Sequence, residues 1–178
     1  MERLKESFWY IYSNPTTRLI TAAGMLRHFS DAIIGSFGPA YFMTTYPSFK
    51  VEFAFVQAIS LTFLGFASNL LSGIIGDKLE KKYPMTKGYL TTISTMISIP
   101  LIFLCCLGHG NFWLSTLALS THILFSGGYH STAITMVENS VSVSKTSNIV
   151  SAWQLYTNLA QVLSPILFSF LGTYLKIS

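Results

Sequence analysis

Two charged side chains stand inside an apolar stretch, where ionisable groups need a partner. Arg27 and Asp31 lie four residues apart, so a helix would carry both on one face. An ionisable side chain at membrane depth is costly unless it is paired, which makes both residues candidates for function. Two interpretations stand side by side: a site for a substrate head group or a coupled proton, and a self-neutralised structural pair.

A row of amide side chains marks the last apolar stretch. Gln154, Asn158 and Gln161 recur at i, i+4 and i+7, so a helix would carry them as one polar stripe. Amides that faced lipid would lack hydrogen-bond partners, so the stripe must face protein or water. Contact with a substrate and hydrogen bonding to a partner helix account for the stripe equally well.

Other polar residues do not form an enzyme site. His122, His130 and Glu138 are spaced by eight residues, which advances an α-helix by about 800°, so they do not share a metal-binding face. Ser126 lies near His130, but it lacks the G-x-S-x-G context of a hydrolase and has no base one turn away. We therefore expect no enzymatic activity, no metal and no cofactor.

The composition indicates the kind of element that must position these residues. Of the 178 residues, 51% are hydrophobic and 10% are charged, and the mean hydropathy is +0.50. A soluble domain is about 25% charged, so a soluble enzyme is excluded. Five apolar stretches are long enough to cross a bilayer, at 18–42, 51–76, 88–107, 112–137 and 148–174. The sequence predicts an all-α, polytopic membrane protein with about five transmembrane helices.

The basic residues predict the orientation of these helices. With five crossings, the amino-terminal side would hold eight of them: Arg3, Lys5, Arg18, Lys78, Lys81, Lys82, Lys87 and Lys145. The opposite side would hold Lys50 and Lys176. Because basic loops stay on the cytoplasmic side, we predict a cytoplasmic amino terminus. The net charge of +4 then reflects topology, and nucleic acid is not an expected partner.

Residues 1–16 predict a separate segment before the bundle of residues 17–178. Leu4, Phe8 and Ile11 fall at i, i+4 and i+7, which is typical of an amphipathic helix lying in the cytoplasmic interface. Asn14 and Pro15 would then turn the chain into the membrane. The alternative is a solvated tail.

One loop carries a specific motif. The segment 73–82 reads Gly-Ile-Ile-Gly-Asp-Lys-Leu-Glu-Lys-Lys. It resembles the motif G-x-L-[AG]-D-[RK]-x-G-[RK]-[RK], which the major facilitator superfamily carries between the second and third helices of each six-helix half. The matching positions are Gly73, Gly76, Asp77, Lys78, Lys81 and Lys82. Glu80 stands where that family usually has glycine. The glycines would allow close helix packing, and the aspartate would accept hydrogen bonds from a facing helix terminus.

Two further stretches resemble parts of the same family. Residues 4–8, followed by residues 14–18, are similar to the segment that leads from the central cytoplasmic loop into the seventh helix. Residues 37–42 resemble the end of that helix in the Spinster-like branch. The chain would then correspond to helices seven to eleven, a partial half-bundle. A complete transporter of this family has two six-helix halves, so the resemblance implies that an amino-terminal half or a partner chain is needed.

The resemblance also implies a site. In this family the first and fourth helices of each half line the central cavity. The resemblance implies Arg27, Asp31, Tyr129 and His130 as residues of a substrate or coupling-ion cavity. The amide stripe adds Gln154, Asn158 and Gln161 as further candidates for this cavity. The implied activity is transport of a small organic or lipid-like solute by alternating access, with membrane lipid around the helices. The alternative is a transport-inactive membrane subunit or assembly protein that retains the half-fold.

Overall fold

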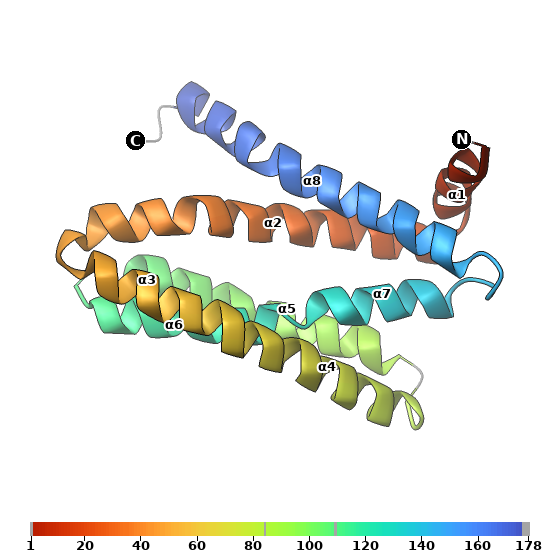
Figure 1. The fold of residues 1–178 in the computed structure, drawn as a ribbon, viewed down its shortest axis with the longest axis horizontal. Coiled ribbons are helices and arrows are strands. Elements are labelled where there is room, and N and C mark those ends of the chain that lie inside the picture. The colour runs from red at the N-terminus through yellow and green to blue at the C-terminus, as the bar shows by residue number, and fades with distance from the viewer. Residues whose placement is uncertain (1, 84, 109, 176–178) are drawn as a thin grey trace. The chain divides into compact units, whose positions relative to one another are not determined.

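A computed structural model describes residues 2–83, 85–108 and 110–175 of the chain. All regular elements in these ranges are helices (Figure 1), which confirms the all-α prediction. In order they are α1 (Glu2–Ser13), α2 (Pro15–Thr45), a 3₁₀ turn η1 (Pro47–Phe49), α3 (Lys50–Ile59), a π turn η2 (Ser60–Leu64), α4 (Gly65–Glu80), α5 (Thr86–Leu107), α6 (Phe112–Ser126), α7 (Tyr129–Asn139) and α8 (Thr146–Leu175).

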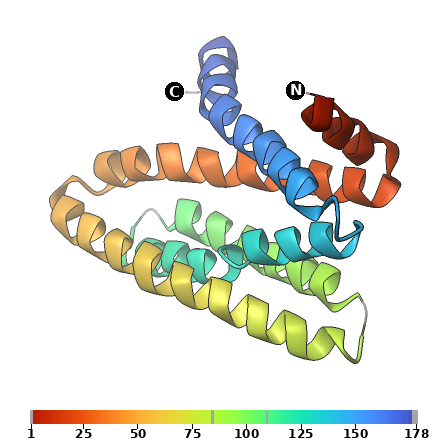
Figure 2. The ribbon, with the colours of Figure 1, turned by 45° about the vertical axis from the view of Figure 1, so that its right-hand side comes forward.

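Within the described residues, three helices are long and apolar enough to cross a membrane, which indicates a membrane protein. The first is a continuous rod, Pro47–Glu80, in which η1, α3, η2 and α4 follow one another without a break (Figure 2). The other two are Thr86–Leu107 and Thr146–Tyr174. The predicted count of about five spans is not confirmed.

Two of the predicted spans, 18–42 and 112–137, are not among these three helices, and the reasons differ. The helix α2 has 31 residues, ample length for a crossing, but it is less apolar, with Arg27 and Asp31 near its middle. The predicted span 112–137 is not one helix, because the chain turns at Gly127 and Gly128. Its parts, α6 with 15 residues and α7 with 11, are each too short to cross alone.

The chain forms two compact units. One comprises the described residues up to Tyr41 together with those from Met136 onward, and the other runs from Phe42 to Thr135. The helices α2 and α7 each contribute residues to both units.

In the first unit, α1 and α2 pack against α8. The backbone N–H of Thr16 donates to Asn14 Oδ1 at 3.0 Å, and Pro15 opens the helix, which ends α1 and caps α2. The face of α1 that contains Ile11 is buried, and Phe8 meets Tyr156 of α8 edge-on at 5.0 Å. Trp9 and Tyr12 beside it are exposed. The apolar face of the amino-terminal segment thus packs on protein, while its aromatic flank is outward.

In the second unit, an aromatic cluster joins the start of the long rod to α6. Phe112 stacks on Phe49 at 4.5 Å, and Phe42 stacks on Phe53 at 4.3 Å. The Tyr46 hydroxyl donates to the carbonyl of Gly108 at 2.8 Å. Such contacts fix one end of the helix pair that the rod makes with α6.

Candidate functional site

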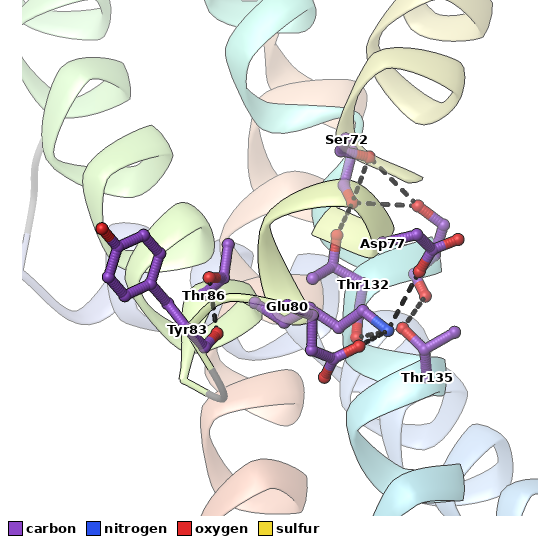
Figure 3. Close-up of polar contacts among 10 residues, drawn as sticks. Ser72, Asp77, Glu80, Tyr83, Thr86, Thr132 and Thr135 are labelled. Atoms are coloured by element: carbon purple, nitrogen blue, oxygen red, sulfur yellow. Dashed lines mark hydrogen bonds and ion pairs between the residues drawn. The ribbon is translucent and has the colours of Figure 1, made fainter. Parts of the chain in front are cut away.

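At the turn between α6 and α7, a backbone carbonyl faces the neighbouring helix α4. Gly128 lies at this turn, and its carbonyl oxygen accepts hydrogen bonds from the hydroxyls of Ser72 at 3.1 Å, Ser131 at 3.1 Å and Thr132 at 2.9 Å. Ser72 reaches across from α4, so the two elements are joined here (Figure 3). A broken helix needs such replacement partners where water is scarce.

Close packing at this turn requires glycine. A Cβ atom on Gly128 would overlap the Ser72 side chain and would lie 2.9 Å from the carbonyl oxygen of Ser68. A Cβ atom on Gly127 would lie 3.2 Å from the Ser68 side chain. The two glycines therefore allow α4 to approach the turn, with small serines facing them.

A cleft of about 360 Å³ lies beside this turn, among α4, α5, α6 and α7. Its wall is apolar apart from hydroxyl groups, and its lining is Ser68, Leu71, Ser72, Ile75, Leu90, Thr91, Ile93, Ser94, Ile97, Leu124, Phe125, Gly128, Tyr129 and Thr132. The volume is in the range of about 300–1,000 Å³ that ligand pockets have. Tyr129 is the predicted cavity residue that lines it. His130, the next residue, is exposed.

The motif loop holds a buried lysine between two carboxylates. Lys87 Nζ lies 2.7 Å from Glu80 Oε2 and 3.2 Å from Asp77 Oδ1, and the Lys87 side chain is 7% exposed (Figure 3). Glu80, the departure from the family motif, thus supplies the shorter contact. Asp77 keeps 71% of its side-chain exposure, so it is accessible while it pairs with Lys87.

The other motif residues have different environments. Gly76 is buried, and a Cβ atom there would meet the Lys87 stem at 3.5 Å. No heavy atom of the described chain lies within 4 Å of a Cβ atom built on Gly73, so this glycine shows no close approach here. Lys78, Lys81 and Lys82 are exposed.

The predicted ion pair in α2 is present. Arg27 Nη2 lies 3.2 Å from Asp31 Oδ1, and the side chains are 9% and 44% exposed. Nε and Nη2 of Arg27 make no hydrogen bond of good geometry, so the attraction is by charge at short range. His28, the next residue, bonds through Nδ1 to the Gly24 carbonyl oxygen at 2.9 Å and meets Trp153 edge-on at 6.0 Å. It therefore belongs to the helix contact.

The amide stripe does not make the contact between α2 and α8. Gln154 is half-buried, and Asn158 and Gln161 are exposed. The contact face carries Trp153, Thr157 and Ser164 instead.

This contact depends on small groups and one aromatic ring. A Cβ atom on Gly24 would lie 3.1 Å from Thr157 and 3.2 Å from Trp153, and Ser164 donates to the Phe29 carbonyl oxygen at 2.7 Å. Thr157 and Ser164 were not singled out from the sequence. They follow Trp153 by four and eleven residues, and this spacing is the helical signal that could have found them.

The predicted cavity residues divide between the two units. Those of the first unit are Arg27, Asp31, Gln154, Asn158 and Gln161, and those of the second are Tyr129 and His130. The sequence predicted Lys87 only as a basic residue of a loop. Its position between two carboxylates becomes evident only from the fold.

Comparisons with known proteins add no assignment. No protein-family model matches the chain, and no curated protein and no solved structure matches it.

Proposed function

We propose that this chain is part of a membrane transporter of the major facilitator type, which moves a small organic or lipid-like solute by alternating access. The observation that carries the proposal is the broken helix at Gly128, whose carbonyl is bonded by hydroxyls next to a cleft of about 360 Å³. Irregular backbone at membrane depth is tolerated where it is buried in protein or lines a cavity, and transporters use broken helices at their sites.

The motif loop supports the same proposal. Asp77 and Glu80 share Lys87 at the junction of α4 and α5, and Asp77 is 71% exposed. An exposed carboxylate at a membrane edge can bind the amino terminus of a facing helix, as the resemblance implies for the other half of the transporter. Rocking of two halves around a midplane site then needs only changes in such contacts and no covalent step.

Uptake by the reconstituted protein tests the proposal. The chain is co-expressed with an amino-terminal half, purified into proteoliposomes and incubated with a total small-molecule extract of cells, and the solutes gained are identified by mass spectrometry. We expect specific solutes to enter, and we expect Asp31→Asn to abolish their entry while Val143→Ala, at a highly exposed loop position, leaves it unchanged.

The same measurement separates the alternative. If no solute enters although both halves are folded and paired, the chain is a transport-inactive subunit and the proposal is wrong.

A further inference from the structure

The cleft among α4, α5, α6 and α7 carries no ionisable side chain except the Tyr129 phenol. Of its five serine and threonine hydroxyls, three donate within the protein: Ser72 and Thr132 to the Gly128 carbonyl, and Thr91 to the Gly88 carbonyl at 2.8 Å. A charged or highly polar occupant would therefore lose water without gaining matching partners. The chemistry of the wall fits a hydrocarbon chain.

The length of the cleft is compatible with the depth of one leaflet of a bilayer. Its α4 lining runs from Ser68 to Ile75, so it ends two residues before Asp77. Seven residues separate Ser68 from Ile75, which is about 10 Å along a helix. The hydrocarbon core is about 30 Å thick, so the cleft spans about a third of it and fits within one leaflet.

Exposed lysines follow the end of the cleft that is closer to Asp77. Lys78, Lys81 and Lys82 are exposed there, at the end of α4 and in the turn that follows. Lys87 is buried against Asp77 and Glu80, so these three charges sum to −1 and do not cancel the three exposed lysines. The hairpin keeps a net charge of about +2, which attracts anionic head groups.

From these observations we propose that the cleft binds one acyl chain of an anionic phospholipid, whose phosphate head group lies against the exposed lysines of the α4–α5 hairpin. The acyl chain supplies apolar surface to Leu71, Ile93 and Ile97, and the head group meets Lys81 and Lys82. The cleft shares Tyr129 with the predicted solute cavity, and the proposal does not depend on transport.

Lipid retention measured by native mass spectrometry tests this site. The full chain is purified in detergent and offered equal amounts of dioleoyl phosphatidylglycerol and dioleoyl phosphatidylcholine. We expect preferential retention of phosphatidylglycerol. The double substitution Lys81→Gln/Lys82→Gln should lower that preference by about fivefold for each lysine removed. Both substitutions alter exposed side chains only, so this test does not depend on whether the Phe variants described below fold.

A matched pair on α5 tests the acyl-chain part. Ser94 lines the cleft and Thr92, two residues earlier, is exposed and does not line it. Ser94→Phe should reduce retention of both lipids, because the ring fills the cleft, while Thr92→Phe should leave retention unchanged. Glycerol 3-phosphate, which has the head-group charge and no acyl chain, should not displace the lipid. Equal retention of the two lipids by the unaltered chain, equal effects of the two Phe substitutions, or displacement by glycerol 3-phosphate would each overturn the proposal.

Discussion

At the residue scale, Lys87, near the start of α5, pairs with two carboxylates of the motif segment 73–82. Its side chain is 7% exposed, and the Glu80 contact at 2.7 Å is shorter than the Asp77 contact at 3.2 Å. Lys87→Met removes the positive partner of both and should lower the free energy of unfolding by about 1–3 kcal/mol. Thermal unfolding in detergent measures this, with Lys78→Met, at an exposed lysine of α4, as the control.

The two carboxylates should differ in the same assay. Glu80→Gln should cost more stability than Asp77→Asn, because Glu80 is less exposed and closer to the lysine. The reverse order would show that Asp77 is the main partner of Lys87.

The two single substitutions of the α2 ion pair should differ in their effect on stability. Asp31→Asn leaves the buried Arg27 without its counter-charge, whereas Arg27→Gln leaves a carboxylate that is 44% exposed. Asp31→Asn should therefore lower the free energy of unfolding by about 3 kcal/mol, which is more than the effect of Arg27→Gln. The double substitution should recover part of this loss of stability.

Uptake by the paired halves decides what the ion pair does. Loss of uptake, or a shifted pH profile, in both single variants assigns the pair to the site. If each variant leaves uptake, pH profile and expression unchanged, the pair is structural.

At the scale of elements, the glycine at the break between α6 and α7 is the position most sensitive to added bulk. Gly128→Ala forces a methyl group against Ser72 and the Ser68 carbonyl and should destabilise the second unit by about 1–3 kcal/mol. Gly73→Ala, in open space on α4, should gain about 0.5–1 kcal/mol as helix propensity predicts. Both are measured by urea unfolding in detergent micelles. Equal effects would mean that the turn can move away from α4.

The sequence predicted the helical class, and the limits of the long apolar helices within a few residues. Hydrophobic length determines these features locally, as in α5, predicted at 88–107 and observed at Thr86–Leu107. The break at Gly128 could be suspected from two adjacent glycines, but length favoured one span. Whether a glycine pair bends a helix depends on what packs against it, here Ser72 from another helix.

The candidate site was less predictable for a similar reason. The i, i+4 spacing of Arg27 and Asp31 sufficed for the ion pair, since a helix alone sets that distance. The cleft and the Lys87 cluster join residues from different helices, and no periodicity within one helix encodes such contacts. The amide stripe has the right period for a helix face, yet Trp153 and Thr157 occupy the face that meets α2, because a wide ring fits against Gly24.

At the scale of the whole molecule, accessibility to a labelling reagent tests the number of crossings. Single cysteines are placed at exposed loop positions in a Cys105→Ala/Cys106→Ala background. Cysteines at Ser48 and Met85 should label from opposite sides, because the rod Pro47–Glu80 separates them.

A second pair of cysteines tests whether the predicted span 112–137 crosses the membrane. If α6 and α7 together cross the membrane, cysteines at Asn111 and Ser144 should label from opposite sides. Labelling of both from one side would remove this crossing and would contradict the five-span prediction.

The last prediction concerns assembly. If the chain needs a second half, then expressed alone it should self-associate and should not transport, because its polar side chains would face lipid. Adding an amino-terminal half should raise its melting temperature, and Asp77→Ala should remove much of that gain. Size-exclusion chromatography and thermal unfolding measure both effects. Concentrative uptake by the purified monomer in liposomes would show that no second half is needed.

The π turn η2 contains one residue more than a regular α-helical turn of the long rod would. Deleting exposed Leu61 or Thr62 would therefore close it into regular helix. Phe53 before it and Ser72 after it would keep their facing directions. A deletion at Ala67, inside regular helix, would swing everything beyond it by about 100° and carry Ser72 away from Gly128. Ser60–Leu64 is thus the stretch of this rod where evolution can change the length of the chain without changing its contacts.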